Sequence, residues 1–288
     1  MATAKDIKKR IAGVKNIQQI TRAMEMVAAA RLRKAQEMAQ SARPYAEKMQ
    51  GLMENLWASV SDDIEHPLLE KREIKKVALT IITSDKGLCG AYNGNMIRKV
   101  QEFINYNSDK DITFLCIGKK GHDFFKRRNL PVINFHPLEV KGVSIEMVKE
   151  IAGELINGYK KREFDQVILF FTRFVTVMNL HPTERGLLPL ERPKGAKAGE
   201  VLQEYLFEPS SAKLMADLLP RFIETEVYNS IVESIASELG SRLVSMRNAT
   251  KNSGEMIDEL TLTYNKARQA SITRELLEIV SGADALSG

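Results

Sequence analysis

The residues best suited to chemistry lie in a glycine-rich turn at positions 85–95. The turn reads DKGLCGAYNGN, with glycines at positions 87, 90 and 94. Such a turn between a strand and a helix can cradle a phosphate, because backbone N–H groups at the start of the helix face the anion. This glycine spacing does not match G-x-G-x-x-G, however, and G-x-x-x-x-G-K-[ST] does not occur in the chain. We therefore expect a structural turn and no bound cofactor.

Other reactive side chains do not form a recognisable catalytic or metal-binding set. Asp85 could act as an acid, but no second carboxylate or histidine accompanies it in sequence. The four histidines are scattered along the chain, and Cys89 and Cys116 have neither metal-ligand spacing nor the number of a disulfide framework. We expect two buried thiols, no catalytic residue and no metal site.

The segment that carries the turn alternates apolar strands with helical stretches. The strand-like runs are KKVALTII, DITFLCIG, LPVINF and QVILFFTRFV. This alternation is typical of a mostly parallel, Rossmann-like sheet that is covered on both faces. We expect a loop at residues 181–200, because it is rich in proline, glycine and charge, and an edge strand in VLQEYLFEPS.

The two ends of the chain are expected to be long helices, because no proline occurs before Pro44 or after Pro220. A helix over residues 221–281 would be roughly 90 Å long at about 1.5 Å per residue, so it needs a partner helix along its flank. Pro220 should kink this helix or mark its start, and Gly282 should end it. One face has the spacing of a left-handed coiled coil; its residues are Leu243, Met246, Thr250, Ser253, Ile257, Leu260, Tyr264, Ala267 and Ser271.

The N-terminal helix supplies the expected partner for this face. Thr3 and Asp6 have the spacing of a capping box, which predicts the helix start. Residues 1–50 hold 11 lysines and arginines against 4 acidic residues, whereas residues 210–288 hold 8 against 11, so the two ends attract each other. The expected apolar face of this helix consists of Ile7, Ile11, Val14, Ile17, Ile20, Met24 and Val27.

These patterns predict an α/β protein with a long antiparallel coiled coil of its N- and C-terminal helices. We place the N-terminal helix at residues 1–60, a linker at 61–76, the central α/β domain at 77–208 and the C-terminal helix at 209–288. The apolar runs are too short to cross a membrane and the first residues lack a secretory signal, so a cytosolic chain is expected. The basic first helix could suggest nucleic-acid binding, but no aromatic residue precedes Tyr45 to stack on bases.

Three motifs carry a resemblance to a known family. The runs IKKRIAGVKNIQQITRAMEMVAAARLRKAQ and LTLTYNKARQASITRELLEIVSGA, at the two ends, closely resemble the gamma subunit of the rotary, proton-translocating ATP synthase. TSDKGLCGAYN resembles the opening turn of that family's central domain. No cysteine lies between Arg173 and Glu208, where plastid relatives carry a thiol switch, so the chain is most similar to a bacterial-type subunit.

The resemblance implies a non-catalytic rotor shaft. In the family, the paired helices turn inside a ring of alpha and beta subunits, which couples proton flow to ATP synthesis or hydrolysis and regulates ATPase activity. It implies as partners the alpha and beta subunits, the epsilon subunit and the c-subunit ring, with no nucleic acid and no direct membrane insertion. It also implies a peripheral location on the cytoplasmic face of the cell membrane.

Individual positions follow from the same resemblance. Met24 matches a methionine near the beta subunits, and a set of polar residues matches positions that face the collar near the shaft's far end: Arg268, Gln269, Thr273 and Glu275. Tyr205 and Glu208 match the foot that touches the c ring, although Phe207 replaces a tyrosine that some members carry. The alternative is a free α/β nucleotide-binding enzyme with a coiled-coil oligomerisation handle, and nucleotide binding by the isolated chain would distinguish it.

Overall fold

The computed structural model describes residues 3–59, 66–138, 142–191 and 211–287. Two long helices, α1 (Ala4–Ser59) and α5 (Ser211–Ser287), enclose the α/β segment in sequence, which confirms the predicted fold class. The capping box is present, because the Asp6 amide donates to Thr3 Oγ1 at 3.3 Å and the Thr3 amide donates to Asp6 Oδ2 at 3.2 Å.

The C-terminal helix does not end at Gly282, as expected, and Pro220 does not mark its start. Pro220 lies inside α5, and α5 continues through Gly282 to Ser287. A proline removes a single intrahelical hydrogen bond, and a helical glycine costs only about 1 kcal/mol relative to alanine. Neither residue therefore has to end a helix that its other contacts support.

The chain divides into two compact units. The first comprises Met1–Ala28 with Leu243–Gly288, and the second comprises Ala29–Arg242. The first unit contains the starting part of α1 and the final part of α5, whereas the second contains the sheet and the remaining helices.

The second unit is built on a five-stranded sheet with the order β3-β2-β1-β4-β5. Its strands are β1 (Lys76–Ile82), β2 (Asp111–Ile117), β3 (Val132–His136), β4 (Gln166–Thr176) and β5 (Asn179–Leu188). Pairing is parallel except between β4 and β5. Because the central strand β1 is buried on both faces, it reads as a continuous apolar run in the sequence.

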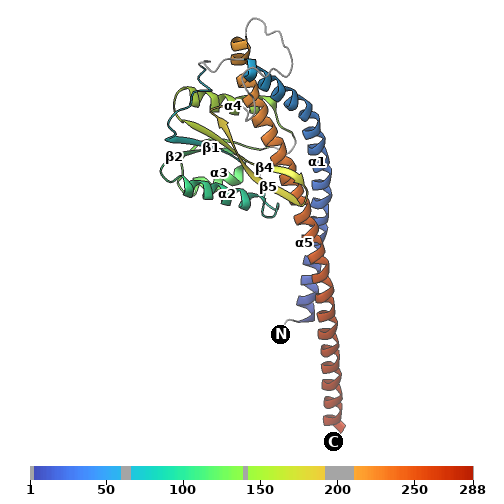
Figure 1. The fold of residues 1–288 in the computed structure, drawn as a ribbon. Coiled ribbons are helices and arrows are strands. Elements are labelled where there is room, and N and C mark those ends of the chain that lie inside the picture. The colour runs from blue at the N-terminus through green and yellow to red at the C-terminus, as the bar shows by residue number, and fades with distance from the viewer. Residues whose placement is uncertain (1–2, 60–65, 139–141, 192–210, 288) are drawn as a thin grey trace. The chain divides into compact units, whose positions relative to one another are not determined.

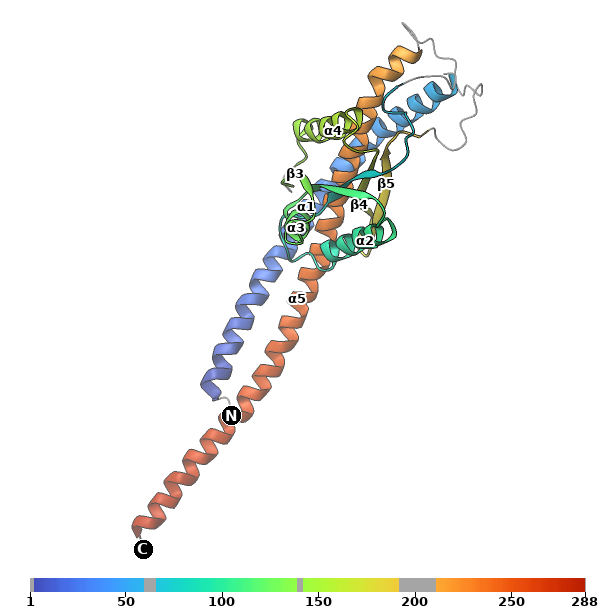
Figure 2. The same ribbon diagram turned by 90° about the vertical axis from the view of Figure 1, so that its left-hand side faces the viewer.

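Helices cover both faces of this sheet. Helices α2 (Tyr92–Tyr106) and α3 (Lys119–Lys126) pack on one face, where Met96, Val100 and Phe125 join the apolar side chains of β1 and β2. Helix α4 (Ile145–Lys160) and the adjoining part of α5 lie on the opposite face (Figures 1 and 2). The result is the doubly covered parallel sheet that the alternation of strands and helices predicted.

The edge strand β5 occupies residues that were expected to be a loop. Residues 179–188 pair antiparallel with β4, and Thr172 of β4 faces Pro182. A proline is tolerated at this position because an edge strand has one side free of ladder hydrogen bonds. The edge strand expected from the sequence, VLQEYLFEPS, lies outside the described residues.

Beyond the point where β1 and β4 stop pairing, helix α5 takes the place of β1 beside β4. The β1–β4 ladder ends at Ile81 and Phe170, yet Thr172 still needs partners for its backbone groups. Its amide donates to Ser234 Oγ at 3.2 Å, and its carbonyl accepts from Ser237 Oγ at 2.9 Å. The serines of α5 therefore bind the side of β4 that β1 no longer pairs, while β5 still pairs with its other side.

Within the described residues, no helix combines the length and the apolar character required to cross a membrane.

Candidate functional site

The glycine-rich turn is closed by hydrogen bonds among its own polar groups. The Ser84 amide donates to Asn93 Oδ1 at 3.0 Å, and Ser84 Oγ donates to the Lys86 carbonyl at 2.7 Å. Asp85 Oδ1 accepts from the Lys119 amide at 2.8 Å, so this carboxylate supports the start of α3. The geometry gives Asp85 a structural role in place of an acid–base one.

Helix α5 takes the position at the carboxyl ends of the strands where doubly wound folds bind nucleotides. The Arg242 guanidinium donates to the Lys86 carbonyl at 3.3 Å and to the Gly87 carbonyl at 3.1 Å. Ser241 Oγ donates to the Cys89 carbonyl at 2.6 Å. We call Ser241 and Arg242, with the carbonyls that they bind, the helix clamp. It binds α5 to the turn through backbone carbonyl groups of the turn.

The helix clamp includes a buried ion pair. Arg242 contacts the Glu238 carboxylate one helical turn away, and the two side chains are 10% and 2% exposed. Burial raises the pKa of Glu238 to about 7, although the nearby charges of Arg242 and Arg31 oppose the shift. Burial also raises the pKa of the neighbouring Tyr92 and Cys89, so both stay neutral near pH 7.

The raised pKa of Glu238 predicts a pH-dependent stability. Between pH 4.5 and 7 the folded chain holds a proton that the unfolded chain, with a glutamate pKa of 4.5, releases, so the contribution of Glu238 to stability is greatest below pH 4.5 and is lost as the pH rises through 7. The variant E238Q has no such carboxylate. Its free energy of unfolding relative to the natural chain should therefore increase by about 2–3 kcal/mol between about pH 5 and pH 8.

Denaturant unfolding at several pH values measures the difference in the free energy of unfolding between E238Q and the natural chain. E163Q is the matched control, because Glu163 is exposed and should give no change in the difference with pH. If the free energy of unfolding of E238Q relative to the natural chain stays constant from about pH 5 to pH 8, the pKa assigned to Glu238 is contradicted.

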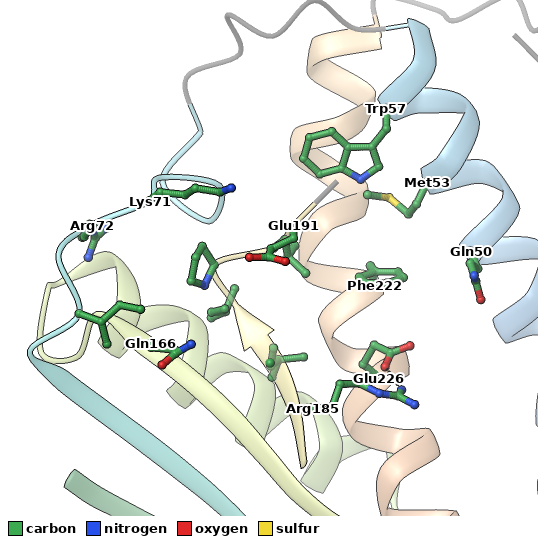
Figure 3. A pocket seen from close by; sticks show the side chains of 16 residues that line it. Gln50, Met53, Trp57, Lys71, Arg72, Gln166, Arg185, Glu191, Phe222 and Glu226 are labelled. Atoms are coloured by element: carbon green, nitrogen blue, oxygen red, sulfur yellow. Dashed lines mark hydrogen bonds and ion pairs between the residues drawn. The ribbon is translucent and has the colours of Figure 1, made fainter. Parts of the chain in front are cut away.

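The second unit also contains a cavity of about 750 Å³ (Figure 3). Ile74, two residues before β1, and Gln166, the first residue of β4, place it at the amino ends of the parallel strands. Arg185 in its wall already pairs with Glu226, and Arg72 pairs with Glu70. The cavity thus lies at the opposite ends of the strands from a Rossmann-type nucleotide site, and two of its cations are neutralised.

The two helices of the first unit form an antiparallel pair. On α5 the predicted seam is confirmed through Ala267, since its residues from Leu243 onward are buried or half-buried, and only Ser271 is exposed. Gln18 Nε2 lies 3.5 Å from the Thr250 carbonyl, and Arg247 pairs with Glu25 at 3.0 Å. Residue numbers rise on one helix as they fall on the other, as antiparallel pairing requires.

The predicted seam of α1 is wrong at Ile17, Ile20 and Val27. Ile17, Ile20 and Val27 are 54%, 60% and 50% exposed, and Met24 is half-buried. A row of buried or half-buried positions beside Met24 continues the alternating three- and four-residue spacing through polar residues; they are Ile7, Ile11, Val14, Gln18, Thr21, Glu25 and Ala28. The prediction placed the seam on apolar residues that lie one position before the true seam residues. The true seam therefore leaves Ile17, Ile20 and Val27 facing outward.

Polar groups of the seam are paired across the two helices. The hydroxyl oxygens of Thr21 and Thr250 lie 2.9 Å apart, and Gly254 leaves space for the Gln18 side chain. Glu25 is 22% exposed and Arg247 is 67% exposed, so their ion pair is only partly shielded from water. The seam is therefore held by close approach and hydrogen bonds as well as by apolar contact.

The final part of α5 is exposed on all sides. Every residue from 268 to 282 is exposed, including the predicted contact residues Arg268, Gln269, Thr273 and Glu275. Figure 2 shows α5 continuing past the N-terminal end of α1. Large apolar side chains in this exposed end have no cover within the described chain; they are Ile272, Leu276, Leu277, Ile279 and Val280. Such an apolar surface indicates a partner.

The structure brings only some of the predicted residues together. Arg268, Gln269, Thr273 and Glu275 share the exposed end of α5, whereas Met24 lies on α1. The expected foot residues, Tyr205 and Glu208, lie outside the described residues. Both predicted buried thiols are confirmed, since Cys89 and Cys116 are free and buried.

Sequence reasoning missed the helix clamp. A signal was present, because residues 230–242 read as apolar or small on nearly every side of the helix, and a helix of that composition is buried all round. The turn carbonyls that Ser241 and Arg242 bind are far away in sequence, so the sequence alone did not reveal their partners.

Comparisons with known proteins agree on one family. A family model described as ATP synthase matches residues 3–286. The chain is 44% identical over 292 residues to the ATP synthase gamma chain of Heliobacterium modesticaldum, which covers 99% of this chain and 100% of the relative. It is 43% identical over 290 residues to the ATP synthase gamma chain of Trichlorobacter lovleyi, with 100% of both chains covered.

Solved structures support the fold. The rotor of the Euglena gracilis mitochondrial ATP synthase in rotational state 1 matches with a TM-score of 0.69 and 20% identity, covering 93% of this chain and 98% of that chain. A chain of the OSCP/F1/c-ring structure from the same organism, in rotational state 3, gives a TM-score of 0.71 over 98% of this chain and 94% of that chain. The full-length sequence matches, with the paired helices and the covered sheet, show that this chain belongs to the ATP synthase gamma-chain family.

Proposed function

We propose that this chain is the central-stalk subunit of an ATP synthase, which rotates inside a ring of alpha and beta subunits. Rotation of the stalk would couple transmembrane proton flow to ATP synthesis or hydrolysis. The observation that carries the proposal is the exposed end of α5, where large apolar side chains lack cover within the described chain. A surrounding ring of subunits would cover this end from several sides as the stalk turns.

A non-catalytic role agrees with the chemistry of the second unit. The turn that could have held a phosphate is bonded to α5 through the helix clamp. Two polar anchors, Ser234 and Ser237, attach the same helix to β4. These bonds support a domain that holds the shaft firmly, as the transmission of torque requires, with catalysis in the alpha and beta subunits.

Specific contacts to the ring follow from the exposed surfaces. Arg268, Gln269, Thr273 and Glu275 would contact the ring near the far end of the shaft, and Met24 would lie near the beta subunits. The outward-facing Ile17, Ile20 and Val27 extend the candidate contact surface along α1. Tyr205 and Glu208 would form the foot on the c-subunit ring.

The remaining assignments concern assembly and location. The epsilon subunit would be a further partner, and the assembled complex would lie on the cytoplasmic face of the cell membrane. We divide the chain by function into shaft helices at residues 1–60 and 209–288, a linker at 61–76 and the central domain at 77–208. The shaft helices would enter the ring, and the central domain would face the c-subunit ring.

Reconstitution tests this function. The purified full chain alone should not hydrolyse ATP, whereas mixing it with the alpha and beta subunits of the same synthase should yield a stable complex with sustained ATPase activity. The alpha and beta subunits without this chain are the control for background hydrolysis. ATP hydrolysis or tight nucleotide binding by the chain alone would favour the free α/β enzyme instead.

A further inference from the structure

Three side chains that can bind a metal meet at the end of β3. They are His136, the last residue of that strand, and Glu150 and Glu154, which lie one turn apart on α4. One ligand atom from each residue lies within 4.8 Å of the others. The sequence does not reveal this group, because the histidine and the glutamates belong to different elements.

The distances in this cluster suit a tetrahedral cation. The Nε2 atom of His136 lies 3.3 Å from Glu154 Oε1 and 3.4 Å from Oε2. Ligands about 2.0–2.1 Å from a tetrahedral Zn²⁺ ion are separated by roughly 3.3–3.4 Å. Glu150 is exposed and can bring its carboxylate closer by side-chain rotation, which leaves a fourth position open to water.

The surrounding structure holds two of the three ligands in place. Asn134 Nδ2 donates to Glu154 Oε1 at 2.6 Å, which orients that carboxylate. The His136 carbonyl accepts from the Gly118 amide at 2.8 Å, and the His136 side chain is only 8% exposed. The position of Gly118 requires glycine, because its φ is +96° and an added Cβ would lie 2.0 Å from the Thr83 carbonyl oxygen.

The charge of the cluster also favours a cation. Two carboxylates face one imidazole, and in the part of the chain that the structure describes neither glutamate forms an ion pair with lysine or arginine. An imidazole nitrogen with carboxylate oxygens suits zinc, whereas magnesium prefers octahedral sites made of oxygen. We propose that His136, Glu150 and Glu154 bind one Zn²⁺ ion that joins the edge strand β3 to α4.

Isothermal titration of the metal-free full chain with ZnCl₂ tests the site. We expect one zinc ion per chain, and no displacement by excess MgCl₂. E150Q and E154Q should each weaken binding by about tenfold or more, as the loss of a ligand requires. In the ¹H–¹⁵N spectrum of the imidazoles, zinc should shift the Nε2 resonance of His136.

Matched variants separate this site from adventitious binding. E102Q alters an exposed glutamate on α2, and H181Q alters an exposed histidine on β5, so neither should change the affinity. E150Q keeps the test valid even if substitution of the buried His136 prevents folding, because Glu150 is exposed. Absence of zinc binding to the natural chain, or binding that E150Q and E154Q leave unchanged, would overturn the proposal and leave a simple His136–Glu154 pair.

Discussion

Replacing Arg242 with alanine (R242A) should destabilise the second unit by about 3–5 kcal/mol at about pH 8, the cost of leaving a buried carboxyl group without its partner. Glu238 is 2% exposed, and without Arg242, which lowers its pKa, its carboxyl group would have to take up a proton to stay in this apolar environment. The carbonyls of Lys86 and Gly87 would lose their guanidinium donor in the same variant. Urea unfolding followed by the fluorescence of Trp57, the single tryptophan, measures the loss.

Two comparisons isolate the buried pair. R247A removes an arginine from the same helix, but its pair with Glu25 is largely exposed, so the expected cost is below about 1 kcal/mol. The double variant R242A/E238Q should be more stable than R242A at about pH 8, because it carries no buried carboxyl group that must take up a proton or stay charged without a partner. Equal costs for R242A and R247A would show that the buried pair contributes nothing particular to stability.

The sequence predicted the elements of this fold better than their contacts. Helix and strand periodicities depend on neighbouring residues, so the terminal helices and the parallel strands were identified correctly. The strand β5 was missed because Pro182 and Gly186 are loop-forming residues, and only pairing with β4 makes residues 179–188 a strand. The position of β5 at the edge of the sheet depends on the tertiary structure, so the composition of the segment alone does not predict it.

The seam of α1 shows the same limit at the candidate site. Apolar periodicity favoured Ile17 and Ile20, yet the fold buries Thr21 and half-buries Gln18. Those polar residues are acceptable in the seam because Thr250 of α5 supplies their hydrogen-bond partners. A seam prediction that considers one helix alone omits this partner, and it therefore also misses the outward-facing isoleucines.

Removing residues 269–288 should leave the isolated chain folded but prevent tight coupling in the assembled synthase. The confirmed seam ends at Ala267 and every residue from 268 to 282 is exposed, so the free energy of unfolding should change by less than about 0.5 kcal/mol. The deletion removes the five exposed apolar side chains named above, each worth about 1.5–3 kcal/mol when fully buried by a partner. Losing even one such contact would weaken assembly about tenfold, since a tenfold change corresponds to about 1.4 kcal/mol.

ATP-driven proton pumping by the reconstituted complex, measured beside its ATPase rate, separates the two effects of this deletion. If the exposed end of α5 transmits torque, pumping should fall more than hydrolysis, because the ring can still turn over ATP around a shortened shaft. Removal of residues 283–288 alone is the matched control, since it retains Arg268, Gln269, Thr273 and Glu275 and should preserve both activities. Full assembly and undiminished pumping after the longer deletion would mean that this end makes no functional contact, and the collar contacts would then have to lie on the paired part of the shaft, where Ile17, Ile20 and Val27 face outward.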